Sequence, residues 1–252
     1  MLSFSKYQGA GNDFILIDDR DQLFNPLSVS KLCKRRFGIG ADGVILLQED
    51  ANADFKMRIF NCDGSEAESC GNGLRCFVQF IQDLGVGRDS IRIKIHGQIV
   101  IGHKVDDRIS IEMGPLPIIK KVFLDEFDLY TLYTGVPHAV IFSSEFEKAK
   151  RIRSNPYFQP EGTNVNFVQK SSSGHFQVRT FERGVEAETL ACGTGACAVA
   201  ATLNKIHRIS SPYLLAFPGG EIEIQIKNNI FSMIGSATLV YQGVLNNNFK
   251  FK

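Results

Sequence analysis

The alternation of apolar and polar residues along the chain predicts a protein dominated by β-strands. Such alternation is typical of strands with one buried face. It marks residues 14–18, 43–48, 55–60, 91–97, 108–113, 138–142, 176–181 and 221–226. Two other segments predict helices. Residues 73–85 place Leu74, Phe77, Val78 and Ile81 at spacings of three and four, and the alanine-rich residues 195–206 predict a deeply buried helix. The chain is therefore expected to have a mixed α/β (α+β) fold.

The two halves of the chain present these segments in one order. FKMRIF (55–60) precedes Cys70 at nearly the same distance as FQVRTF (176–181) precedes Cys192. Further upstream, KYQGAGNDFILI (6–17) resembles LYTGVPHAVIF (132–142). A repeat of about half the chain is too long for a solenoid and predicts two similar domains related by a pseudo-twofold axis.

Two prolines interrupt strand-like sequence at GPLPI (114–118), which predicts the domain boundary there. The expected domains are residues 1–116 and 117–235. A strand within residues 236–252 is expected to return to the first domain.

Composition excludes several classes of protein. The 252 residues are 44% hydrophobic, which is enough for a substantial core. A net charge of +1 provides no broad field for nucleic acid or an anionic membrane, so neither is an expected partner. No apolar run approaches the roughly 18 residues of a membrane span. The N-terminal residues lack the pattern of a secretory signal, so a cytoplasmic location is expected.

Six cysteines are present, and a chain of this size does not need disulfides. An isolated cysteine is more often a small core residue than a catalyst, and Cys33, Cys62, Cys76 and Cys197 are interpreted in this way. The spacings C-x5-C and C-x4-C, with no histidine cluster nearby, do not match a zinc site, so no metal is expected. GIGADG (38–43) matches a dinucleotide pattern, but strand-like GVILLQ follows it instead of a helix.

Cys70 and Cys192 stand out because each precedes Gly-x-Gly and a predicted helix. The glycines allow tight backbone geometry. The N–H groups and dipole of a helix N-terminus favour negative charge, so they lower a thiol pKa and can hold a carboxylate. Two such helix ends facing one cleft would place an amino-acid α-carbon between two sulfurs. One thiolate could remove the α-proton and a thiol on the other side could return one, which inverts the centre.

Six motifs, which together span nearly the whole chain, resemble those of a known enzyme family. They are GAGNDF (9–14), RIFNCDGSEAESCGNGLRC (58–76), PHAVI (137–141), NVNFVQ (164–169), ERGVEAETLACGTGACA (182–198) and PGGEI (218–222). The chain closely resembles the diaminopimelate epimerase family, cofactor-independent enzymes that interconvert LL- and meso-diaminopimelate. The resemblance implies two domains, each a curved, mostly antiparallel sheet around a central helix, with the active site in the interdomain cleft. It also implies a role in lysine and peptidoglycan precursor biosynthesis, a small-molecule substrate and no cofactor.

The resemblance further implies roles for named residues. Cys70 and Cys192 are the acid/base pair, and the backbone of Gly71, Asn72, Gly193 and Thr194 holds the reacting carboxylate. The residues expected to line the substrate pocket are Asn12, Asn61, Asn164, Glu182 and Arg183. Arg183 can form a bidentate pair with the distal carboxylate, Asn61 and Asn164 can donate to it, and Glu182 can accept from the distal ammonium. His138 can support the cysteine chemistry, although a lone histidine can equally be structural.

Three departures from the family pattern leave alternatives open. Val136 stands where asparagine is usual, Gly43 stands where glutamine is usual, and the loop from Glu182 to Cys192 is one residue longer. A lost hydrogen bond relaxes discrimination, so a racemase of broader specificity that also accepts glutamate is a second hypothesis. A non-catalytic amino-acid-binding protein is a third, against which the paired cysteines argue. Edge strands in both domains are compatible with a homodimer.

Overall fold

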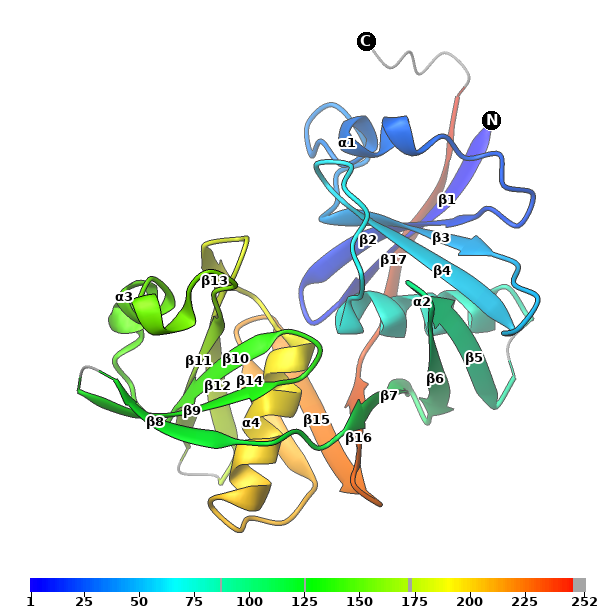
Figure 1. The fold of residues 1–252 in the computed structure, drawn as a ribbon. Coiled ribbons are helices and arrows are strands. Elements are labelled where there is room, and N and C mark those ends of the chain that lie inside the picture. The colour runs from blue at the N-terminus through cyan, green and yellow to red at the C-terminus, as the bar shows by residue number, and fades with distance from the viewer. Residues whose placement is uncertain (87, 125, 172–173, 247–252) are drawn as a thin grey trace. The chain divides into compact units, whose positions relative to one another are not determined.

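The chain divides into two compact units, which are described separately (Figure 1). Unit 1 comprises Met1–Ile111 and Gly235–Lys252, and unit 2 comprises Glu112–Ile234. The computed structural model describes residues 1–86, 88–124, 126–171 and 174–246. The part of the expected C-terminal segment from 247 to 252 therefore lies outside the described residues. No helix in the described part of the chain is long and apolar enough to cross a membrane.

Unit 1 is a mixed sheet of eight strands. Its strands are β1 (Leu2–Gly9), β2 (Asn12–Asp18), β3 (Gly43–Gln48), β4 (Phe55–Asn61), β5 (Ser90–Ile95), β6 (Gln98–Val105), β7 (Arg108–Pro115) and β17 (Thr238–Leu245). The chain passes into unit 2 within β7, after Ile111. The order across the sheet is β17-β1-β2-β3-β4-β5-β6-β7. The pairs β2–β3 and β4–β5 are parallel, and the others are antiparallel. The last strand of the chain thus completes the sheet that the first strand begins.

Unit 2 is built in the same way. Its strands are β8 (Lys120–Leu124), β9 (Phe127–Tyr133), β10 (Pro137–Ile141), β11 (Asn164–Lys170), β12 (Phe176–Glu182), β13 (Ala187–Thr189), β14 (Tyr213–Phe217), β15 (Gly220–Lys227) and β16 (Ile230–Gly235). The main order is β8-β9-β10-β11-β12-β14-β15-β16, and short β13 pairs with β12. Here β10–β11 and β12–β14 are the parallel pairs.

The two strand orders therefore repeat one pattern, in which the third and fifth pairs are parallel and the remaining five are antiparallel. β4 corresponds to β12, and β1–β2 corresponds to β9–β10, as the sequence comparison of the two halves predicts. The internal repeat is confirmed as a repeat of strand order and pairing.

Each sheet packs around one helix of 13 residues. α2 (Gly71–Asp83) contacts β1, β2, β3, β6 and β17, and α4 (Gly193–Lys205) contacts β9, β10, β11 and β15. Both predicted helices are confirmed, and each begins two residues earlier than predicted, directly after its cysteine. In α4 the buried positions run without a break from Gly195 to Leu203, in agreement with its predicted deep burial.

Shorter helices cover the other face of each sheet. They are α1 (Val29–Leu32) and α3 (Ala149–Arg153), with 3-10 turns η1 (Pro26–Ser28), η2 (Phe146–Lys148) and η3 (Pro156–Phe158). In β3, Val44 and Leu46 join the cluster around α1, whereas Ile45 lies against Gly73 of α2. Alternate residues of one strand point to opposite faces. Both faces of β3 are therefore covered, which explains its continuous apolar sequence.

Candidate active site

Cys70 is the N-cap residue of α2. Its backbone is extended (φ −152°, ψ 114°), and its Sγ accepts a hydrogen bond from the N–H of Gly73 at 3.4 Å. The first helical backbone bond runs from Leu74 N to Cys70 O. The N–H groups of Gly71 and Asn72 precede that bond, so they belong to the end of the helix that attracts anions. The sulfur thus occupies the position in which a serine or aspartate oxygen usually caps a helix.

A second residue with a defined orientation contacts Cys70. Cys70 Sγ lies 3.6 Å from Asn12 Oδ1, an acceptor. The Asn12 amide is oriented by its other end, because Nδ2 donates to Asp42 Oδ2 at 2.7 Å. Asp42 is in turn paired with Arg35 at 2.8 Å. The structure therefore presents a carbonyl oxygen, and not an amide N–H, to the sulfur of Cys70.

Arg75 is a fully buried cation in α2, five residues after the cysteine. It donates to Asn72 Oδ1 at 3.0 Å and to the carbonyl of Ser236 at 3.2 Å. Burial lowers the pKa of Arg75, and the nearby Cys76 and Cys70 oppose that change. The guanidinium therefore fixes the Asn72 side chain and adds positive charge near Cys70.

Cys192 is the N-cap residue of α4 and repeats the geometry of Cys70. Its backbone is extended (φ −127°, ψ 109°), and its Sγ accepts from the N–H of Gly195 at 3.3 Å. The neighbouring polar group is different, because Cys192 Sγ lies 3.5 Å from the hydroxyl of Thr194. The Thr194 backbone carbonyl accepts from Thr134 Oγ1 at 2.8 Å. The prediction that both cysteines lie at helix N-termini is confirmed.

His138 lies at the start of β10 and links Thr194 to the interior of unit 2. Its Nε2 is 3.0 Å from Thr194 Oγ1, and its Nδ1 is 3.0 Å from Asn166 Nδ2. Burial is the main cause, and the charge of Arg183 a second one, of a pKa lowered to about 3. His138 is therefore a neutral imidazole throughout the physiological range.

Asn164, Glu182 and Arg183 come together at the ends of two paired strands. Asn164 begins β11 and Glu182 ends β12, and Asn164 Oδ1 accepts from the N–H of Arg183 at 2.7 Å. Asn164 Nδ2 is 3.5 Å from His138 Nε2. The Arg183 guanidinium donates to Glu161 O at 2.8 Å. Burial raises the pKa of Glu182. These residues join the group around Cys192 within unit 2.

The second glycine after each cysteine packs closely against its surroundings, more closely for Gly195 than for Gly73. A Cβ on Gly195 would lie 2.4 Å from Asn166 Oδ1, and a Cβ on Gly73 would lie 3.1 Å from Ile59 Cδ1. Neither glycine has a positive φ, so the tight geometry predicted here is one of close packing and not of a left-handed backbone. The constraint is close packing of the first helical turn against the sheet.

Three of the remaining cysteines are core residues, as expected. Cys33, Cys76 and Cys197 are buried, and burial raises the pKa of the first two to about 12 and that of Cys197 still further. Cys62 requires a correction because it is exposed. It follows the last residue of β4, in an exposed turn closed by a hydrogen bond from Gly64 N to Asn61 O.

Asn61 lies in that same turn, where its side chain donates to Ser65 Oγ at 3.0 Å. It belongs to unit 1, together with Asn12, Cys70, Gly71 and Asn72. The predicted site residues His138, Asn164, Glu182, Arg183, Cys192, Gly193 and Thr194 belong to unit 2. The predicted site residues thus form two groups, one within each unit.

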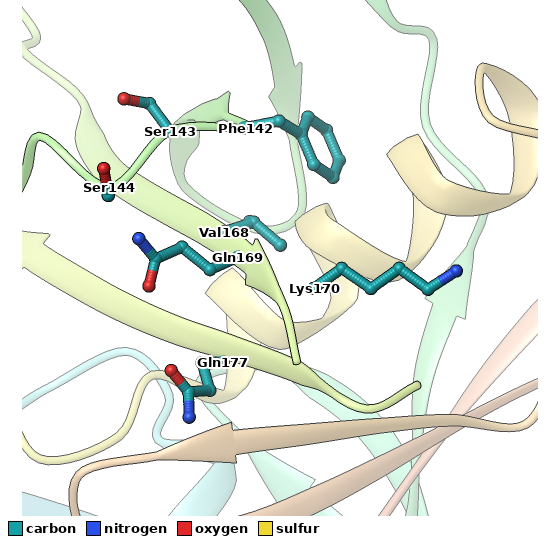
Figure 2. Close-up of a pocket in the computed structure, with 7 residues that line it drawn as sticks. All are labelled: Phe142, Ser143, Ser144, Val168, Gln169, Lys170 and Gln177. Carbon is teal, nitrogen blue, oxygen red and sulfur yellow. The ribbon is translucent and has the colours of Figure 1, made fainter. Parts of the chain in front are cut away.

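A surface pocket of about 450 Å³ lies elsewhere in unit 2 (Figure 2). Its lining residues are Phe142, Ser143, Ser144, Val168, Gln169, Lys170 and Gln177. Gln169 and Gln177 are direct partners on β11 and β12. The lining includes neither a cysteine nor any other predicted site residue, so we assign this pocket no part in the chemistry.

The structure adds residues that the sequence analysis did not single out. Asn166 contacts His138, Asp42 orients Asn12, and Arg75 orients Asn72. Two of them had a signal in the sequence: Asn166 stands between apolar Val165 and Phe167, and Arg75 stands between apolar Leu74 and Cys76. Asp42 lies in GIGADG, where the strand β3 does follow, as predicted against a dinucleotide site.

Solved structures define the class of this fold. A PhzF-family phenazine biosynthesis protein from Bacillus anthracis is 14% identical and matches with a TM-score of 0.74, over 97% of this chain and 99% of that one. A hydroxyproline epimerase from Agrobacterium vitis is 16% identical, with a TM-score of 0.70 over 96% and 91%. The chain therefore has the two-domain fold that these proteins share.

Sequence comparisons identify the family within that class. The family model described as diaminopimelate epimerase matches residues 4–119 and 130–240. Diaminopimelate epimerases from a Synechococcus strain and from Methanocella arvoryzae are 42% and 38% identical to the chain. The first match covers 89% of this chain and 90% of the relative, and the second covers 98% of each. The chain belongs to the diaminopimelate epimerase family, and it is an epimerase.

The alternatives from the sequence analysis are not favoured by these relatives. The structure also gives Gly43 a role in packing, since a Cβ there would lie 2.4 Å from the carbonyl oxygen of Phe60. Gly43 is therefore needed for the close approach of β3 and β4, which share a register at Gly43 and Asn61.

Proposed function

We propose that this protein interconverts LL- and meso-diaminopimelate, and so supplies precursors of lysine and peptidoglycan. Membership of the family supports the substrate. The observation that carries the mechanism is the pair of cysteine N-caps, since the same sulfur-capped helix end occurs once in each repeat. A protein that only binds an amino acid needs no such pair of acid/base groups.

In the proposed reaction the two sulfurs act on one α-carbon from opposite sides. The thiolate of one cysteine takes the α-proton, and the bonding electrons stay on the substrate as a carbanion. The thiol of the other cysteine then gives its proton to the opposite face of that carbon. The product is the inverted centre, and the thiolate has moved from the first cysteine to the second.

Both helix ends contribute to holding the reacting carboxylate in this proposal. The N–H groups of Gly71 and Asn72 precede the first backbone bond of α2, and those of Gly193 and Thr194 begin α4. Helix N-termini favour an anion. They favour it more strongly when the α-carbanion adds negative charge to the carboxylate, so they lower the barrier as well as binding the substrate.

The distal half of the substrate carries a second carboxylate and ammonium. The backbone N–H of Arg183 donates to Asn164 Oδ1, so the two residues are neighbours at the ends of β11 and β12. We assign the distal carboxylate to Arg183, Asn164 and Asn61, and the distal ammonium to Glu182. Asn12 completes the lining beside Cys70. The chemistry needs a free thiol and thiolate, which suits a cytoplasmic location, and a homodimer remains part of the proposal.

Proton exchange in heavy water tests this function. Reduced protein is incubated with LL-diaminopimelate, NMR follows loss of the α-proton, and chiral chromatography follows inversion. We expect both to occur together. Cys70→Ser and Cys192→Ser should each reduce inversion by about 10³-fold or more, because a serine hydroxyl is a far weaker acid and base than a thiol.

Cys62→Ser is the matched control, because Cys62 is exposed and lies outside both caps. It should leave the rate unchanged. If either cap variant retained the wild-type rate, the two-thiol mechanism would be rejected. If diaminopimelate showed neither exchange nor inversion, the proposed substrate would be rejected as well.

A further inference from the structure

The hydrogen bonds around His138 have a defined direction that ends at the sulfur of Cys192. We propose that Asn166 locks His138 in the neutral tautomer with its proton on Nε2, and that His138 and Thr194 thereby direct a hydroxyl hydrogen onto the Cys192 thiolate. His138 is then a positioning residue and not the base that deprotonates Cys192. The catalytic meaning of this relay rests on the proposed function.

The direction is set at Asn166, whose amide has a determined orientation. Its Nδ2 donates to the backbone carbonyl of Ala139 at 3.1 Å, and a carbonyl can only accept. Its Oδ1 accepts from the Thr180 hydroxyl at 2.9 Å. The atom 3.0 Å from His138 Nδ1 is therefore the amide nitrogen, which is a donor. Asn166 is fully buried, so water does not compete for these bonds.

Because Asn166 donates to Nδ1 of His138, this ring nitrogen must accept the hydrogen bond with its lone pair. A neutral imidazole has one protonated nitrogen, so its proton lies on Nε2. The reverse tautomer would place two donors 3.0 Å apart at Nδ1. Asn164 Nδ2 would favour that reverse tautomer by donating to Nε2, but it is 3.5 Å away. The closer contact at Nδ1 decides in favour of the Nε2 proton.

Thr194 continues this direction of hydrogen bonding from His138 to Cys192. Its Oγ1 accepts from His138 Nε2 at 3.0 Å, and the hydroxyl hydrogen is left to point elsewhere. Cys192 Sγ lies 3.5 Å from that oxygen, within reach of the hydrogen. A hydroxyl that donates to sulfur stabilises the thiolate more than the thiol, because the hydrogen bond to a charged acceptor is stronger.

The charged and titratable groups near this relay act in known directions. The positive charge of Arg183, which follows β12, opposes protonation of His138, as does burial. Cys197 of α4 interacts with Cys192, but burial keeps its thiol protonated. The imidazole therefore stays neutral while Cys192 gains and loses its proton, so the direction of the relay does not reverse during turnover.

NMR tests the tautomer without reference to activity. Long-range ¹⁵N–¹H correlation of the full-length protein distinguishes Nε2–H from Nδ1–H for each of its five histidines, and His138→Gln assigns the signal. We expect His138 to show Nε2–H without titration between pH 5 and 8. A proton on Nδ1, or a midpoint within that range, would overturn the relay.

A second measurement tests the bond to sulfur. In a Cys70→Ser background, the alkylation rate of Cys192 by iodoacetamide is measured against pH by peptide mass spectrometry, with exposed Cys62 as an internal reference. Thr194→Val should raise the midpoint for Cys192 by about one pH unit, a tenfold loss of thiolate. Thr194→Ser keeps the hydroxyl and should restore the wild-type midpoint.

An unchanged midpoint in Thr194→Val would reject the hydrogen bond to Cys192. The proposed function is judged by a separate result, the exchange of the α-proton of diaminopimelate. A protein with the expected tautomer and midpoint but no exchange would retain the relay and lose the epimerase proposal. Exchange with the opposite tautomer would retain the epimerase and overturn the relay.

Discussion

The two cysteine caps share a backbone but differ in their surroundings. In both, the sulfur accepts a hydrogen bond from the third residue after it, at 3.4 Å for Cys70 and 3.3 Å for Cys192. Beside Cys70 stands the carbonyl oxygen of Asn12, and beside Cys192 stands the hydroxyl of Thr194. The first group favours a thiol and the second can favour a thiolate. A repeat can therefore preserve a helix cap while its side chains make the surroundings of the two copies chemically unequal.

The buried residue in the second turn of each helix is a second difference between the surroundings of Cys70 and Cys192. Five residues after the cysteine, α2 has the guanidinium of Arg75 and α4 has the uncharged thiol of Cys197. Positive charge near Cys70 acts against the effect of Asn12, since it favours the thiolate. Cys70 thus lies near both a positive charge and an acceptor, whereas the Thr194 hydroxyl beside Cys192 belongs to a chain of neutral groups.

The largest expected difference between the units is in their response to acid. His138 has a folded pKa of about 3, below the roughly 6.5 of an unfolded chain, so the unfolded state binds more protons in between. The stability from keeping it neutral is complete above pH 6.5 and is lost at up to about 1.4 kcal/mol per pH unit as the pH falls toward 3. Urea unfolding at pH 4 should therefore show a loss of roughly 3 kcal/mol relative to pH 6.5.

His138→Gln is expected to flatten this dependence between pH 6.5 and 4. In unit 1, burial alone would raise the pKa of Asp13, but Arg35 and Lys6 outweigh burial and lower it. The stability from Asp13 is present above the unfolded pKa of about 4 and is lost only below it. Asp13→Asn should therefore leave the slope above pH 4.5 intact. If the free energy of unfolding of His138→Gln fell between pH 6.5 and 4 as steeply as that of the wild type, the low pKa assigned to His138 would be contradicted.

The next largest difference is expected when the buried residue in the second turn of α2 or of α4 is replaced. Arg75→Met leaves Asn72 Oδ1 and the Ser236 carbonyl without the guanidinium donor, which should reduce the free energy of unfolding by about 2–3 kcal/mol. Cys197→Ala removes one buried sulfur and should cost about 1 kcal/mol. Urea titrations compare the two. Arg75→Met should also raise the pH midpoint for alkylation of Cys70, and a lowered midpoint would show that the charge does not reach the sulfur.

A smaller difference is expected when a methyl group is added inside each cap. Gly195→Ala would force the new Cβ against Asn166 Oδ1, a buried atom held by hydrogen bonds, and should cost about 1–2 kcal/mol. Gly73→Ala meets the mobile ends of Ile59 and Ile45 at 3.1 and 3.2 Å, and alanine is the better helix former. Thermal unfolding should therefore place Gly73→Ala above Gly195→Ala. The opposite ranking would refute the packing argument.

The smallest effect concerns the acceptor beside Cys70. In a Cys192→Ser background, Asn12→Ala removes the carbonyl oxygen that stabilises the thiol, so the alkylation midpoint of Cys70 should fall by up to about one pH unit. The sign is opposite to that expected for Thr194→Val at Cys192. Two shifts in the same direction would mean that the variants act through accessibility and not through the polarity of the two hydrogen bonds.

The sequence alone determined the repeat, the two central helices and the position of each cysteine. These features depend on local patterns: apolar spacing in residues 73–85, alanine content in 195–206, and glycine after cysteine at a helix start. The exposure of Cys62 was not predicted, because a single cysteine gives no periodic signal and its place one residue beyond β4 depends on where that strand ends.

Only the tertiary structure decided which polar atoms face each sulfur. Asn12 and Asp42 are 30 residues apart in the sequence, and His138 and Asn166 are 28 residues apart. Strand pairing brings the members of each pair together. The orientation of an amide depends on its partner at the other end, Asp42 for Asn12 and Ala139 for Asn166. Sequence patterns therefore determined where the two capping cysteines lie along the chain, and long-range hydrogen bonds determined the polar atoms that each sulfur meets.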